Sequence, residues 1–224
     1  MNKNDVIAMI SEYLAEPIFA GFKVRKSDCS LVCKTASGFR EVMFDRYPGY
    51  DLDRKALALE VTANYSIRYN VFLKWFEKYS VKDLKVQRQI PSLGFDNGML
   101  GGERTFCFLE DGRGFKSDAA KYRREVLKNA TYVFTNFGTL NDMYRNYIIP
   151  HIADNCKFFF HNVEWGLEMM VITRLIAPED YEKNKQVIMN RFEEINALKD
   201  PNIEFYYDRL PEIIADMEQM EFKV

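Results

Sequence analysis

The chain has 224 residues, 47% of them hydrophobic and 29% charged, with 31 Lys and Arg against 33 Asp and Glu. These proportions are typical of a globular protein with one large domain or two small ones. Because the charges nearly balance, a general polyanion binder is excluded, and we expect no nucleic acid among the partners. No apolar run approaches the roughly 18 residues that a membrane span needs, so we expect no membrane association either.

The N-terminal segment and the cysteines both indicate a cytoplasmic protein. Asp5 and Glu12 interrupt the apolar residues near the start of the chain, a pattern that does not fit a secretory signal. Four cysteines in a chain of this length are typical of reduced thiols.

The first elements predicted are one helix and two strands. Residues 5–16 have apolar side chains at helical spacing, and Pro17 lies near the expected end. Residues 31–35 and 39–47 then read as strands joined by a turn, and Pro48 with Gly49 is expected to close the second strand.

Strict alternation over residues 57–69 predicts a long strand with one apolar and one polar face. The apolar face comprises Leu57, Leu59, Val61, Ala63, Tyr65, Ile67 and Tyr69. Glu60, Asn64 and Arg68 share the opposite face, which can hold a ligand or partner but can equally be exposed to solvent.

A hairpin and a run of helices are expected after this strand. Turn residues at 96–102 predict a hairpin whose second arm is 104–109, and residues from 117 onward have helical periodicity. An apolar stripe at helical spacing comprises Tyr122, Val126, Ala130, Val133 and Phe137. Thr139 with Asp142 resembles a capping box, Asn162 is a candidate cap, and Pro178 and Pro211 are expected at helix starts.

Strands therefore gather in the first half of the chain and helices in the second, which predicts an α+β fold. We expect an antiparallel β-meander over residues 22–110, packed on helices, followed by a mostly helical C-terminal half. The predicted domains are residues 1–115 and residues 116–224, sharing one core.

No sequence motif names a reaction. Cys29 and Cys33 are separated by three residues rather than the two common in zinc and redox motifs, and we expect no metal and no cofactor. The alternative is an enzyme of unrecognised class with a His/carboxylate site. It would use His151 with Asp154 and His161 with Glu164, because groups three residues apart share one face of a helix.

The charge distribution favours a non-catalytic protein-binding module instead. Residues 151–224 carry 8 Lys and Arg against 15 Asp and Glu. The acids and aromatics near the C-terminus predict a surface for a basic protein, although a solvated helix face would have the same pattern. The candidate partner-binding residues are Glu204, Tyr206, Asp208, Glu212 and Asp216.

The order of elements over residues 5–110 resembles a group of small bacterial α+β domains classed as domains of unknown function. The resemblance is carried by the segments Gly21–Lys23, Phe39–Phe44 and Leu57–Thr62, which follow the first helix. Some of these domains lie near toxin–immunity systems, so the resemblance implies an immunity-type binding protein. It implies no catalytic residue.

Overall fold

The computed structural model describes residues 3–157, 163–199 and 201–222, and it has the α+β fold expected from the sequence. The chain forms two compact units, each built from two separate segments. Unit 1 comprises residues 1–68 and 93–135, and unit 2 comprises residues 69–92 and 136–224. The predicted boundary at residue 115 falls at the first turn of a helix, most of which belongs to unit 1.

The described strands of unit 1 form a six-stranded sheet in which β1 to β5 follow one another as an antiparallel meander. The strands are β1 (Lys23–Arg25), β2 (Ser30–Thr35), β3 (Gly38–Asp51), β4 (Ala56–Tyr69), β5 (Leu93–Asp96) and β6 (Phe106–Leu109).

Strand β3 is longer than expected, since it continues through Pro48 and Gly49 to Asp51. The prediction that these two residues close the strand is therefore wrong. Strand β2 pairs with β3 only as far as Met43, which leaves the later part of β3 without a β2 partner on that side. Proline is tolerated there because an edge position needs no N–H donor.

The hairpin expected after residue 96 does not form, because β5 and β6 both pair with β4. Strand β5 lies opposite residues 64–67 of β4, and β6 lies opposite residues 58–61. Both strands run antiparallel to β4, so β6 continues along β4 in the same direction as β5, and the predicted pairing of the two arms is wrong.

The burial of β4 follows the predicted alternation from Val61 to Ile67 and departs from it at both ends of the strand. At the C-terminal end, Arg68 of the predicted polar face is buried. Leu57 is 61% exposed, while Ala58 is fully buried. The prediction that Leu57 faces the core is wrong, because Ala58 occupies the buried position at this end of the strand.

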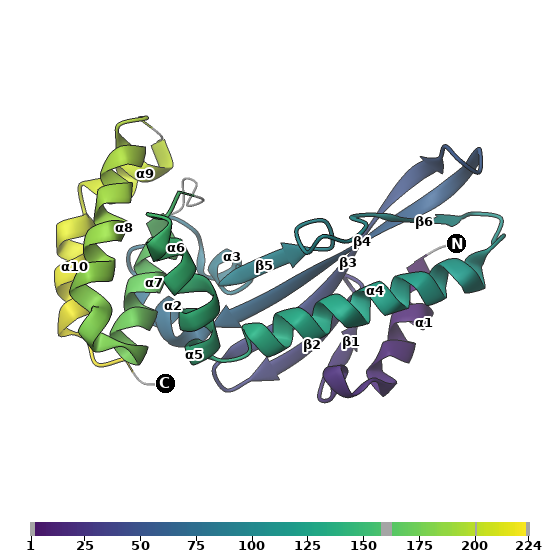
Figure 1. Ribbon diagram of the computed structural model, residues 1–224, viewed down its shortest axis with the longest axis horizontal. Coiled ribbons are helices and arrows are strands. Elements are labelled where there is room, and N and C mark those ends of the chain that lie inside the picture. Colours follow the sequence, from purple (N-terminus) through teal and green to yellow (C-terminus); the bar gives the residue numbers. More distant parts are fainter. Residues whose placement is uncertain (1–2, 158–162, 200, 223–224) are drawn as a thin grey trace. The chain divides into compact units, whose positions relative to one another are not determined.

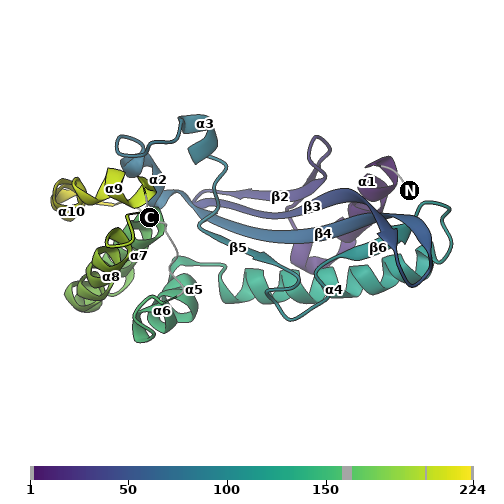
Figure 2. The ribbon, with the colours of Figure 1, turned by 90° about the horizontal axis from the view of Figure 1, so that it is seen from above.

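The helices of unit 1 cover one face of the sheet. They are α1 (Lys3–Ser11), the 3₁₀ turns η1 (Glu12–Ala15) and η2 (Pro17–Phe19), and α4 (Phe115–Asn136). Both ribbon views show α4 running along the sheet (Figures 1 and 2). The predicted stripe is buried throughout, from Tyr122 in α4 to Phe137 directly after its end. The ring of Tyr122 packs edge-on against Phe44 and Phe108.

Unit 2 consists of helices whose core is rich in aromatic rings. They are α2 (Asn70–Phe76), α3 (Leu84–Gln87), α5 (Leu140–Met143), the π-turn η3 (Tyr144–Ile148), α6 (Ile149–Ala153), α7 (Val163–Ile176), η4 (Pro178–Asp180), α8 (Tyr181–Asn196), α9 (Pro201–Tyr207) and α10 (Leu210–Gln219). The Thr139–Asp142 capping box is confirmed at α5. Asn162, the expected cap of α7, lies outside the described residues.

Candidate functional site: an acid-rimmed cleft

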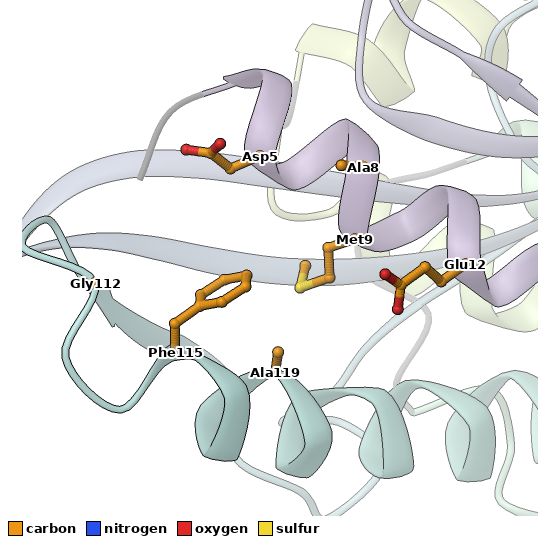
Figure 3. A pocket seen from close by; sticks show the side chains of 7 residues that line it. All are labelled: Asp5, Ala8, Met9, Glu12, Gly112, Phe115 and Ala119. Carbon is orange, nitrogen blue, oxygen red and sulfur yellow. The ribbon is translucent and has the colours of Figure 1, made fainter.

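A cleft of about 410 Å³ lies in unit 1, between α1 and the start of α4. This volume lies in the range of small-molecule and side-chain binding pockets. The lining residues come from both helices and the loop before α4, and are Asp5, Ala8, Met9, Glu12, Gly112, Phe115 and Ala119. Figure 3 shows the two helices and these side chains.

The cleft is open because the facing side chains are short. Ala8 on α1 and Ala119 on α4 leave space that longer side chains would fill. Met9 and Phe115 point toward each other and form the apolar floor (Figure 3). Gly112 lines the cleft with its backbone. Its φ of +77° favours glycine, because residues with a side chain rarely adopt it, while a Cβ at this position would contact no other atom.

The rim of the cleft is acidic. Asp5 in α1 and Glu12 at the start of η1 lie at opposite ends of one side of the cleft, and both side chains are exposed. The guanidinium of Arg123 lies over the ring of Tyr13 and bonds to Glu16 at 2.6 Å, so Arg123 is already paired with another carboxylate. The cleft therefore combines an apolar floor with negative charge at both ends.

A second hollow, of about 380 Å³, is organised around Arg54 in the turn after β3. Its guanidinium donates to Asp51, to Asp118 and to the carbonyl oxygen of Cys107 at 2.6–2.7 Å. Because Arg54 is occupied by these partners, we interpret this hollow as a structural junction.

Neither of two thiols with a resolved pKa is activated. Burial raises the pKa of Cys107 above its ordinary value and raises the pKa of Cys156 to about 11. A thiol that stays protonated at neutral pH is a poor nucleophile.

The predicted C-terminal surface is divided between exposed and internal residues. Glu204, Asp208 and Glu212 are all exposed. Tyr206 is buried, and its hydroxyl accepts from the amide of Val81. Asp216 accepts from the indole Nε1 of Trp75 at 2.5 Å and pairs with Lys78 at 2.7 Å, so this partly exposed carboxylate is already engaged by partners within unit 2.

The predicted polar face of β4 is also largely engaged. Asn64 donates to Asp45 at 2.8 Å, and both lie in unit 1. Arg68 is only 4% exposed, with its guanidinium over the ring of Phe39. Glu60 is half-buried and its carboxylate lies against Gly49.

The His/carboxylate residues are not joined to one another in the described part of the chain. Nδ1 of His151 lies 2.8 Å from the carbonyl oxygen of Tyr147, and Asp154 pairs with Lys157. Glu164 bonds to Lys82 at 2.9 Å and accepts from Tyr206. His161 lies outside the described residues, within which no group of three His, Cys, Asp or Glu side chains could hold a metal ion.

Sequence reasoning missed the cleft because its walls come from residues more than 100 positions apart. In the sequence, Asp5 and Glu12 are only charges in an amphipathic segment. The only local signals are two small residues close to large apolar ones. Ala8 is next to Met9, and Ala119 lies one helical turn after Phe115. Nothing local indicates that these two positions face each other.

Comparisons with protein-family models, curated proteins and solved structures found no match to this chain. The resemblance to small bacterial α+β domains therefore stays a prediction. None of the helices within the described residues is long and apolar enough to cross a membrane.

Proposed function

We propose that this chain is a non-catalytic protein-binding module whose partner is a basic protein. The observation that carries the proposal is the cleft between α1 and α4, with Met9 and Phe115 as its floor and acids at its rim. An apolar centre surrounded by polar groups is the usual organisation of a protein-binding surface.

The exposed acids of unit 2 support the same kind of partner. Glu204 and Glu212 are exposed, and between them on α9 the ring of Phe205 is 45% exposed. A negative surface accelerates encounter with a cationic protein, and salt weakens the effect. Two separate acidic features thus favour a basic partner.

The test is comparative capture from native lysate with the cleft open and closed. Ala119→Leu fills the cleft, and Ala120→Leu adds the same side chain at the next, exposed position of α4. We expect a basic protein to be retained by the wild type and by Ala120→Leu, lost from Ala119→Leu, and released by salt. Identical captured sets from all three proteins, or a captured protein that is not basic, would contradict the proposal.

The specific form that the sequence resemblance implies is an immunity protein, which binds and inhibits a toxin. Its test is co-expression of the captured partner with either Ala119→Leu or Ala120→Leu. A toxin partner should arrest growth with the first variant and be neutralised by the second. Growth that is unaffected by the partner alone removes the immunity role.

A further inference from the structure

The two rim acids of the cleft are separated by seven residues, which is the feature that specifies the ligand. Asp5 lies in α1, and Glu12 is the first residue of the 3₁₀ turn η1 that directly follows Ser11, which still has right-handed helical dihedral angles. Seven residues of helical backbone are about two turns, so Asp5 and Glu12 lie on one face, roughly 10 Å apart along the axis. Figure 3 shows them at the two ends of the cleft, with Met9 between them. A ligand with a single cationic group could contact only one of the two acids. A ligand that contacts both needs two cationic groups at a matching distance.

The space between the acids suits apolar side chains. Met9 is 6% exposed and adapts its shape readily, and the half-buried ring of Phe115 faces it. The short side chains of Ala8 and Ala119 allow a third element to approach both helices closely. An apolar side chain entering here would be covered by carbon on both sides.

The charge of Glu12 is available to a ligand. Within the described residues, Glu12 has no ion-pair partner, and the neighbouring Arg123 pairs with Glu16. Asp5 lies in the first turn of α1, where a carboxylate also stabilises the helix dipole. A substitution at Glu12 is therefore the cleaner probe of ligand charge.

We propose that the cleft binds an amphipathic helix of the basic partner, with cations at positions i and i+7 and apolar side chains at i+3 and i+4. This inference rests on the proposed function and specifies how the partner is recognised. The seven-residue spacing places one cation opposite Asp5 and the other opposite Glu12, with the apolar pair over Met9 and Phe115. Helix-in-groove recognition commonly uses such i, i+3, i+4, i+7 anchors.

The experiment follows the methyl signal of Met9 by NMR in protein labelled at the methionine methyl groups. Met9→Leu assigns the signal. The probes are three Ala-rich helical peptides with Leu at i+3 and i+4: one with Lys at i and i+7, one with Glu at those positions, and one with Lys at i and i+11. Ala119→Leu closes the cleft, and Ala120→Leu is the matched control.

Only the first peptide should shift the Met9 signal saturably, and the shift should vanish in Ala119→Leu and persist in Ala120→Leu. Glu12→Gln should weaken binding about fivefold, whereas Asp53→Asn, which removes an exposed charge outside the cleft, should not. Equal binding of the Glu peptide or of the wrongly spaced Lys peptide would overturn the inference.

The peptide and capture experiments separate the two proposals. If capture depends on Ala119 but no peptide moves the Met9 signal, the binding function stands and the helical recognition is wrong. If the first peptide binds as expected but no protein is captured, the recognition chemistry stands and the proposed function fails.

Discussion

Nη1 of Arg54, in the turn between β3 and β4, donates to Oδ2 of Asp118 in α4 at 2.6 Å, across 64 residues of sequence. Through Asp51 and the carbonyl oxygen of Cys107, the same guanidinium also bonds to β3 and β6. Hydrogen bonding to Asp118 raises the pKa of Arg54 further, so the group stays charged. One side chain thus joins two strands and the helix whose first turn lines the candidate cleft.

Arg54→Lys should lower the free energy of unfolding by about 1–2 kcal/mol, because an ammonium cannot satisfy three separately placed acceptors as a planar guanidinium does. Urea denaturation measures the change. The matched control is Arg113→Lys, since Arg113 is exposed and bonds to Asp111 two residues away. An equal effect of the two substitutions would show that the Arg54 junction has no special role.

The burial along β4 predicts opposite outcomes for the same substitution at its two ends. Val61→Asp should cost about 3–5 kcal/mol or abolish folding, because Val61 is fully buried and a carboxylate there has no partner. Leu57→Asp should change stability by less than about 0.5 kcal/mol, since Leu57 is 61% exposed. Thermal unfolding of both variants measures the two changes in stability. A strongly destabilised Leu57→Asp protein would support strict alternation along the whole strand.

The local sequence pattern is sufficient to predict most helices and strands, but it is insufficient to predict which strands pair. Alternation identifies β4, and the stripe from Tyr122 identifies α4, because both signals depend only on which residues face a core. Whether β6 pairs with β5 or with β4 depends on distant contacts, and the same turn residues suit either outcome. For that reason the fold class follows from the sequence, whereas the cleft between Ala8 and Ala119 does not.

Gly166 marks a close crossing of α7 and α8 within unit 2. A Cβ at Gly166 would lie 2.4 Å from the ring of Phe192, which is fully buried and cannot move aside freely. Alanine in a helix interior normally stabilises relative to glycine by about 1 kcal/mol. Here the overlap should outweigh that gain, with a net loss of about 1–2 kcal/mol.

The measurement for Gly166→Ala is a double-mutant cycle with Phe192→Leu, which removes the obstructing ring. The alanine should be less costly in the Phe192→Leu background, giving a coupling of about 1 kcal/mol or more between the two positions. Additive effects would mean that the helices do not cross closely at this point.

Asp216 is the residue through which acid should weaken unit 2. Its hydrogen bond from Lys78, with further bonds from Trp75 and Tyr79, holds the pKa of the carboxyl below its ordinary value of 3.8. Well above pH 3.8 the carboxylate is charged in both the folded and unfolded states, and its full contribution to stability is present. As the pH falls through this value, the unfolded chain takes up the proton first, so stability falls until the folded carboxyl is protonated as well.

Asp216→Asn should therefore flatten the pH dependence of stability below about pH 4 and change it little at neutral pH beyond a small constant offset. The offset is small because Lys78 and Asp216 are partly exposed and solvent screens the pair. Urea midpoints measured from neutral pH down into the acid range test this expectation, with Glu212→Gln on the exposed face of α10 as the control. If the control variant lost the same acid sensitivity, the effect would arise from the general negative charge of unit 2. A loss of acid sensitivity confined to Asp216→Asn would show that this sensitivity arises from the bonds of Asp216 to Lys78 and Trp75. The exposed acids Glu204 and Glu212 would then remain available for a basic partner.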